Sequence, residues 1–220
     1  MLVIISAAIC PHPPLLVPTV AGGAAFETDD LRAACDLALR RMLAASPRQV
    51  VIIGSDGAAV RLRDFAPGAP GLPDGSQPLP LLIGDWLLDR VVVGAERRCA
   101  VAVRPDGSPV GRWPDLADPT GLLVMADGSA RRSVKGPGYL DERAGPFDAA
   151  VTAALASADL DALLGLDEAL AADLLVGGVG PLKALATLTA PASGAAWQAE
   201  ILYDGAPYGV QYTVASWSRV

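Results

Sequence analysis

The sequence contains a single histidine, His12, among its 220 residues. Imidazole is the side chain best suited to metal ligation and to proton transfer near neutral pH. One histidine excludes any site that takes two imidazoles from the same chain, and it excludes a second histidine acting as a base. Position alone favours the plain interpretation, in which His12 is hydrogen-bonded at a strand end, because an isolated histidine is a weak functional signal.

Positive charge is also scarce. The net charge is −7, and Lys135 and Lys183 are the only lysines. An acidic chain without a basic stripe is a poor binder of nucleic acid and of anionic membranes. No uninterrupted apolar run is long enough to cross a bilayer, and the apolar N-terminus lacks a basic leader. We therefore predict a cytoplasmic protein with no nucleic-acid or membrane partner.

The cysteines are few. Cys10, Cys35 and Cys99 are widely spaced, which excludes a disulfide framework and a zinc knuckle. We expect Cys35 and Cys99 to be small core residues. Cys10 lies two residues before His12, so an extended segment would direct both side chains the same way. We favour a core position for Cys10 over a role as a thiolate metal ligand.

Hydrophobic residues are abundant, at 52% of the chain. Short apolar runs alternate with segments of helical period, which predicts parallel strands joined by helices. We expect strands at 2–9, 49–53, 96–103 and 122–126, helices at 28–45, 147–158, 167–176 and from residue 181, an apolar run at 79–83 before a short helix at 84–88, and a hairpin of strands 195–203 and 209–217. The fold class is α/β: a single domain over residues 1–220, with a mostly parallel central sheet and helices on both faces.

Polar turns follow three of the expected strands. Prolines on both sides of His12 end the first strand there, because proline cannot continue a sheet ladder. Asp56 follows the second strand and Asp127 follows the strand at 122–126. We expect the first two strands to lie side by side through a right-handed crossover, so that His12 and Asp56 face one crevice, which Asp127 joins. Open α/β sheets bind ligands at this edge.

Two further features have both a structural and a functional interpretation. Glu200 lies within an otherwise apolar strand, where a buried carboxylate needs a partner; the alternative is the solvent face of an edge strand. Gly177-Gly178-Val179-Gly180 is glycine-rich, but the third glycine of a dinucleotide fingerprint would fall at Lys183. We interpret it as a helix terminator before a helix that begins at Pro181.

The segment Ile9-Cys10-Pro11-His12-Pro13-Pro14-Leu15-Leu16 resembles the N-terminal motif of class III extradiol ring-cleavage dioxygenases, the family of the catalytic subunit of protocatechuate ring-opening dioxygenase. Three further segments resemble that family in the same order along the chain. Residues 50–57 resemble its second metal-ligand turn, residues 126–130 the loop with its acid–base histidine, and residues 197–212 the segment with its carboxylate ligand.

The resemblance implies a mononuclear non-haem Fe(II) site that opens a catechol-type ring with dioxygen. Carried over by position, His12 matches the first ligand and Glu200 the carboxylate ligand. Asp56 stands where the second histidine ligand belongs, and Ala130 stands where the acid–base histidine belongs. A His12, Asp56 and Glu200 set would suit Mn²⁺, Mg²⁺ or Zn²⁺ at least as well as Fe²⁺, and the departures leave open that no metal binds.

The absence of the acid–base histidine matters more than the change of metal ligand, because general acid–base catalysis typically contributes about 10²–10⁴-fold to the rate. Tyr139 and Asp127 are the candidate substitutes, together with Ser129 and Asp141, which lie near the same loop.

Three function hypotheses follow. The chain is an extradiol dioxygenase with an altered and weakened site, a metal-dependent hydrolase, or a non-catalytic fold relative that acts as a binding or assembly partner. A catechol-type small molecule is the expected ligand in the first case, and a homo-oligomer is compatible with all three.

Overall fold

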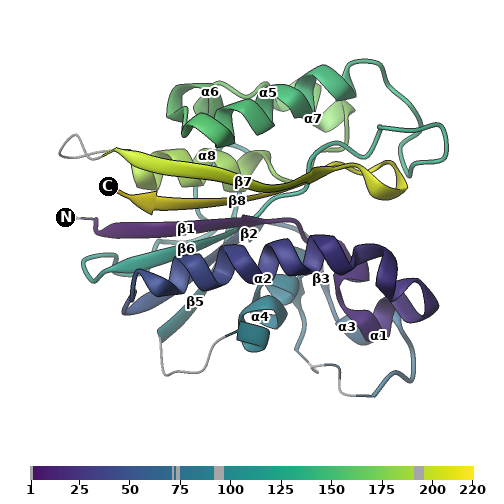
Figure 1. Cartoon of the computed structure of the whole chain (residues 1–220), viewed down its shortest axis with the longest axis horizontal. Helices are drawn as coiled ribbons and strands as arrows, with labels where there is room; N and C mark the ends of the chain where they lie inside the picture. Colours follow the sequence, from purple (N-terminus) through teal and green to yellow (C-terminus); the bar gives the residue numbers. More distant parts are fainter. Residues whose placement is uncertain (1, 71, 73–74, 92–96, 191–195) are drawn as a thin grey trace.

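The computed structural model describes residues 2–70, 72, 75–91, 97–190 and 196–220, which form a single α/β domain (Figure 1). The expected strand ends Glu96 and Ala195 lie outside the described residues. The remaining parts of those strands are present, and the predicted fold class is confirmed at the level of one α/β domain with a mostly parallel central sheet.

The central sheet has six strands in the order β5-β2-β6-β1-β8-β7. β1 pairs in parallel with β6, which pairs in parallel with β2, and β2 pairs in parallel with β5. β8 is antiparallel to β1, and β7 is antiparallel to β8. The bounds are β1 (Ile4–Cys10), β2 (Gln49–Ser55), β5 (Arg97–Val103), β6 (Thr120–Met125), β7 (Trp197–Gly205) and β8 (Tyr212–Arg219).

The prediction that the first two strands lie side by side in the sheet is wrong. β6 lies between β1 and β2 and pairs with both. The chain thus inserts a later strand between two consecutive ones. As a result, the residue that follows β6, and not the one that follows β2, lies next to His12.

Helices cover both faces of the sheet (Figure 1). On one face lie α5 (Ala144–Ser157), α6 (Leu160–Leu164), α7 (Glu168–Asp173) and α8 (Val179–Thr189); on the other lie α2 (Asp29–Ala44) and α4 (Leu79–Val91). Shorter elements surround them: η1 (Pro14–Leu16), α1 (Pro18–Ala21), η2 (Gly22–Thr28), α3 (Leu62–Phe65), η3 (Pro207–Gly209) and a two-stranded sheet of β3 (Ala59–Val60) and β4 (Gln77–Pro78).

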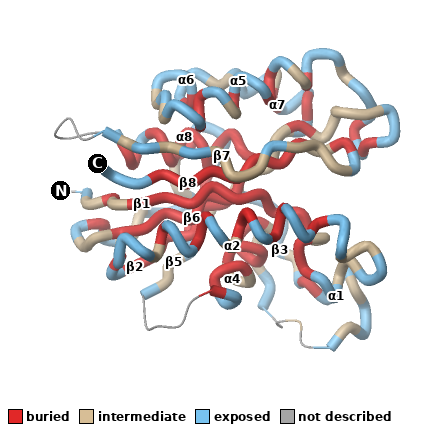
Figure 2. Tube along the Cα trace, viewed as in Figure 1, coloured by how far each residue is buried: buried red, intermediate tan, exposed pale blue. Residues whose placement is uncertain are grey.

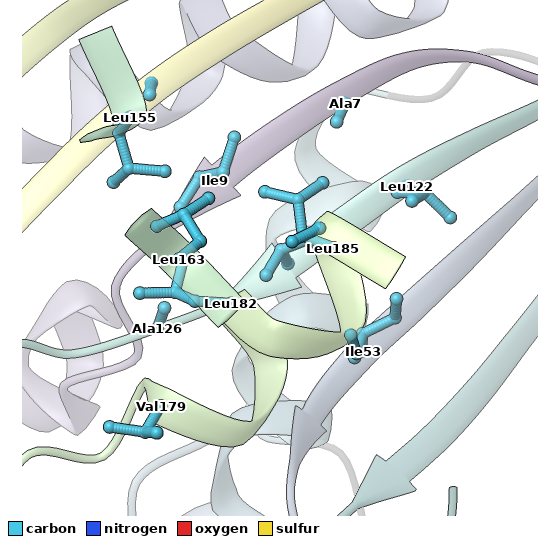
Figure 3. Close-up of a cluster of buried hydrophobic side chains, with 14 of the residues drawn as sticks. Ala7, Ile9, Ile53, Leu122, Ala126, Leu155, Leu163, Val179, Leu182 and Leu185 are labelled. Carbon is cyan, nitrogen blue, oxygen red and sulfur yellow. The ribbon is translucent and has the colours of Figure 1, made fainter. Parts of the chain in front are cut away.

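The apolar character of the strands follows from this double coverage. In β1, Ala7 and Ile9 enter the core beneath α5–α8, whereas Ala8 and Cys10 enter the core beneath α2 and α4. A strand buried on both faces reads as a continuous apolar run. Figure 2 shows the sheet as the buried centre of the molecule, and Figure 3 shows α8 packed on the first of these cores through Leu182 and Leu185.

The apolar run at 79–83 and the short helix at 84–88 are one helix, α4. α4 lies between the sheet and the segments around it, so its side chains are apolar on two sides. The sequence of α4 therefore does not show the period of a helix that is apolar on one side only. Gly84 permits this packing, since a Cβ there would lie 2.6 Å from the Cγ2 of Ile52. No helix in the part of the chain that the structure describes has the length and apolarity to span a membrane.

Candidate functional site

His12 lies just beyond the end of β1, where the predicted crevice begins. The residue is only 8% exposed, and its backbone N–H donates to Oδ1 of Asp127 over 2.7 Å. The same oxygen is 3.5 Å from Nδ1 of the imidazole. Nδ1 is buried and makes no hydrogen bond with any residue that the structure describes. His12 is therefore not the satisfied strand-end histidine that the plain interpretation requires.

Asp127 follows β6 and is the acid that the sheet brings to His12. β6 holds it there because Met125 pairs with Cys10 and the N–H of Ala126 donates to the Cys10 carbonyl over 2.8 Å. Burial raises the pKa of Asp127 above its ordinary value of 3.8, although the imidazole and backbone N–H of His12 act in the opposite direction. Asp127, predicted as a substitute acid–base residue, thus shares one small polar site with His12.

Asp56 directly follows β2 and is exposed; β2 lies two strands from β1 in the sheet order. Its carboxylate accepts the N–H of Gly57 over 2.9 Å. With Ser55 it lines one side of a cavity of about 320 Å³, which Arg104 and Glu168 also line. The far side of this cavity is formed by Gly177, Val179 and Gly180 at the start of α8.

Glu200 does not belong to this site, which corrects the predicted ligand set. It pairs across the sheet with Ser216, which pairs with Ala8, so it lies roughly 10 Å to the side of β1 and well before His12 along the strand. Its carboxylate binds the guanidinium of Arg41 on α2 over 2.8 Å, and both side chains are solvent-exposed. The alternative interpretation, the solvent face of an edge strand, describes Glu200 correctly.

Asp127 aside, neither Tyr139 nor Ala130 in the segment after β6 supplies a buried base. Tyr139 is 73% exposed and has a left-handed backbone with φ of +59°. Its phenol is therefore directed to solvent. Ala130 has its N–H bonded to the carbonyl of Leu174 over 3.1 Å and offers no acid–base group.

The donor set does not fit a metal with three protein ligands. Within the described ranges, no three His, Cys, Asp or Glu side chains are grouped closely enough to hold a metal ion. Cys10 is fully buried on the α2 side and contacts Cys35. Burial, and then this contact, raise the pKa of the Cys35 thiol, which suits neutral core cysteines rather than a thiolate ligand.

Sequence reasoning missed the structural role of the glycine run. A Cβ at Gly178 would lie 2.8 Å from the carbonyl oxygen of Asp127, and a Cβ at Gly180 would lie 2.3 Å from that of Arg104. These glycines let the start of α8 approach the ends of β6 and β5. The signal was a glycine cluster directly before a helix, which we interpreted only as a terminator.

Sequence reasoning also missed Asp148, a buried acid on α5. It accepts the N–H of Ser129 over 2.9 Å and also the Ser129 hydroxyl, and it pairs with Arg132 over 3.2 Å. Arg132 in turn donates to Gln211 over 2.6 Å. This network fixes the loop that carries Asp127. Its only sequence signal is an acid within the apolar stretch of α5.

No protein-family model matches this chain, and no curated protein matches it in a sequence search.

Proposed function

We propose that this chain is a relative of the class III extradiol dioxygenases that binds a small molecule at the carboxyl edge of its sheet and does not open aromatic rings. The observation that supports the proposal is the separation of the three expected ligands. His12 has Asp127 beside it, Asp56 is two strands away, and Glu200 is bound to Arg41.

Ring opening needs a metal held by protein donors with open positions for substrate and dioxygen, and a base that takes the substrate protons. The described residues supply one imidazole and one adjacent carboxylate at His12. The metal-dependent hydrolase hypothesis requires a similar donor set and is disfavoured for the same reason. The binding hypothesis requires only a cavity with a few polar groups at this edge, and the cavity of about 320 Å³ fits it.

The proposal is tested by two parallel assays on the full chain. The first measures oxygen uptake and ring opening with a panel of catechols after anaerobic Fe(II) loading. The second measures binding of phenols and small organic acids to the metal-free protein by calorimetry. Each assay compares the wild type with His12→Ala and with Glu200→Gln, the matched control on the far strand.

We expect no ring opening above background, and binding that His12→Ala weakens while Glu200→Gln leaves it unchanged. Ring opening by the Fe(II)-loaded wild type that both substitutions abolish would contradict the proposal. Absence of any binding at this edge by the wild type would also contradict it.

A further inference from the structure

The cavity of about 320 Å³ combines polar residues from the strand ends with apolar residues from the helices. Ser55 and Asp56 line it at the end of β2, and Arg104 lines it just beyond the end of β5. The apolar lining comes from α7, from the loop that follows it and from the start of α8: Ala171, Ala172, Val176 and Val179. A ligand that suits this cavity therefore has both a polar and an apolar part.

Asp56 and Arg104 are neighbours at the ends of two paired strands. Ser55 pairs with Val103 in the parallel ladder of β2 and β5, and the N–H of Asp56 donates to the Val103 carbonyl over 2.9 Å. Asp56 and Arg104 follow these residues directly, so their backbones lie about 5 Å apart, the usual spacing of neighbouring strands. No ion pair joins these two oppositely charged residues, both of which the structure describes. Two opposite charges thus lie side by side at the cavity without a direct contact.

Each of these two charged groups keeps hydrogen-bonding capacity that no described residue uses. The carboxylate of Asp56 accepts the N–H of Gly57 through Oδ1 over 2.9 Å, which leaves Oδ2 open. The guanidinium of Arg104 donates only through Nη1, to the Pro109 carbonyl over 2.7 Å and to a neighbouring serine hydroxyl, which leaves Nε and Nη2 open. Both charged groups are therefore available to a ligand.

The third charged residue of the cavity lining is already neutralised. Glu168 accepts a hydrogen bond from the ammonium group of Lys183 over 2.6 Å. Asp56 and Arg104 are thus the two charged lining residues that form no ion pair within the described ranges. A simple cation is attracted by Asp56 and repelled by Arg104, and the reverse holds for a simple anion. A ligand that carries both charges close together is attracted by both residues.

We infer that this cavity binds an α-amino acid with an apolar side chain. The ammonium group of the ligand binds the carboxylate of Asp56 and the hydroxyl of Ser55, its carboxylate binds the guanidinium of Arg104, and its side chain packs on the apolar residues of α7 and α8. The inference rests on the proposed function, since it names the class of small molecule that this edge of the sheet binds. His12 does not line the cavity but lies against Gly177, which does, so His12→Ala loosens that part of the lining.

The test is an NMR titration of the metal-free full chain with L-leucine and with two compounds that each lack one of its charged groups. Isopentylamine lacks the carboxylate, and isocaproate lacks the ammonium group. The variants are Asp56→Asn, Arg104→Gln and Ala172→Phe, the last of which fills the apolar side of the cavity without a change of charge. Glu200→Gln and Arg41→Gln are the matched controls, because they make the same changes of charge at an exposed ion pair that does not line the cavity. The spectra themselves show whether each variant folds.

We expect L-leucine to shift the amide signals of the cavity lining saturably, at about millimolar concentration because Asp56 and Arg104 are exposed. Isopentylamine and isocaproate should each bind about fivefold more weakly, because each has lost one charged contact. Asp56→Asn should weaken the binding of L-leucine and isopentylamine but not of isocaproate. Arg104→Gln should weaken the binding of L-leucine and isocaproate but not of isopentylamine. Ala172→Phe should weaken the binding of all three compounds, and both control variants should bind them like the wild type.

Three results would overturn the inference: no saturable binding of L-leucine, binding of either analogue as tight as that of L-leucine, or binding of L-leucine that neither Asp56→Asn nor Arg104→Gln weakens. Failure of this inference is distinguishable from failure of the proposed function. If L-leucine does not bind while phenols still bind at this edge, only the amino-acid site is overturned. If the Fe(II)-loaded protein opens catechols, the proposed function falls whatever the titration shows.

Discussion

At the scale of single residues, the site is defined by one buried acid and one imidazole without hydrogen-bond partners. Asp127 uses one oxygen to accept the backbone N–H of His12 and lies 3.5 Å from Nδ1. Burial is the largest influence on its carboxyl group and raises its pKa above 3.8. The folded chain therefore holds the Asp127 proton more tightly than the unfolded chain does. Protonation of Asp127 favours folding.

This has a consequence for the pH dependence of stability. Because the folded pKa is raised, the contribution of Asp127 is fully present below its unfolded pKa and is lost as the pH rises through the folded pKa. Asp127→Asn removes this titration and keeps an oxygen that can accept the N–H of His12. We expect the free energy of unfolding of the variant, relative to the wild type, to increase between about pH 4 and pH 7. Urea unfolding at both pH values measures it, and a constant or decreasing difference would contradict the argument.

The two adjacent glycines of the α8 start provide a second test at single positions. A Cβ at Gly178 would lie 2.8 Å from both the Cβ of Ala126 and the carbonyl oxygen of Asp127, whereas a Cβ at Gly177 meets no atom closer than 3.4 Å. We expect Gly178→Ala to lower the free energy of unfolding by about 1–3 kcal/mol through overpacking, and Gly177→Ala to change it by less than about 0.5 kcal/mol. Chemical denaturation of both variants checks this. Equal losses of unfolding free energy in the two variants would show that the contact between the start of α8 and the end of β6 is not rigid.

At the scale of elements, the loop between β6 and α5 is held by buried polar contacts rather than by apolar packing. Asp148 on α5 binds the backbone and hydroxyl of Ser129 and the guanidinium of Arg132. Two further backbone hydrogen bonds tie Gly128 and Ser129 to Gln211, each over 2.8 Å. The loop that carries Asp127 is thus fixed from both sides.

Asp148→Ala tests this arrangement. Removing the acid leaves Arg132 and the buried groups of Ser129 without their partner, so we expect a loss of about 3–5 kcal/mol in the free energy of unfolding. Asp173→Ala is the matched control, because the exposed ion pair of Asp173 with Arg143 contributes less than about 1 kcal/mol. If the two variants lose similar stability, Asp148 does not hold the loop.

The sequence predicted the helices and strands better than it predicted which strands lie next to one another. Runs such as 49–53 and 122–126 identify strands because residues buried on both faces are apolar throughout. The placement of β6 between β1 and β2 depends on pairings between distant segments, which no local pattern encodes. The same dependence on distant pairings explains why the site was predicted only in part. The sequence identified both His12 and Asp127 as candidates, but it predicted Asp56 as the neighbour of His12. It could not show that Glu200 binds Arg41, because the two residues are 159 positions apart in the chain.

At the scale of the whole molecule, the sheet order decides which polar turns can cooperate. His12 and Asp127 follow adjacent strands and meet, whereas Asp56 and Glu200 each lie two strands from β1, on opposite sides of it. A site that needs three of these side chains on one metal would require a different strand order. A binding site that needs only a cavity with a few polar groups at this edge requires only the order that is present.

The most direct test of this account is the metal content of the full chain after anaerobic incubation with Fe(II), Mn(II) or Zn(II) and removal of free metal. Elemental analysis would compare the wild type, His12→Ala and Glu200→Gln. The account predicts well under one metal per chain, at the same level in all three proteins. About one metal per chain in the wild type, lost in both variants, would contradict it by showing that His12 and Glu200 meet on a metal after all.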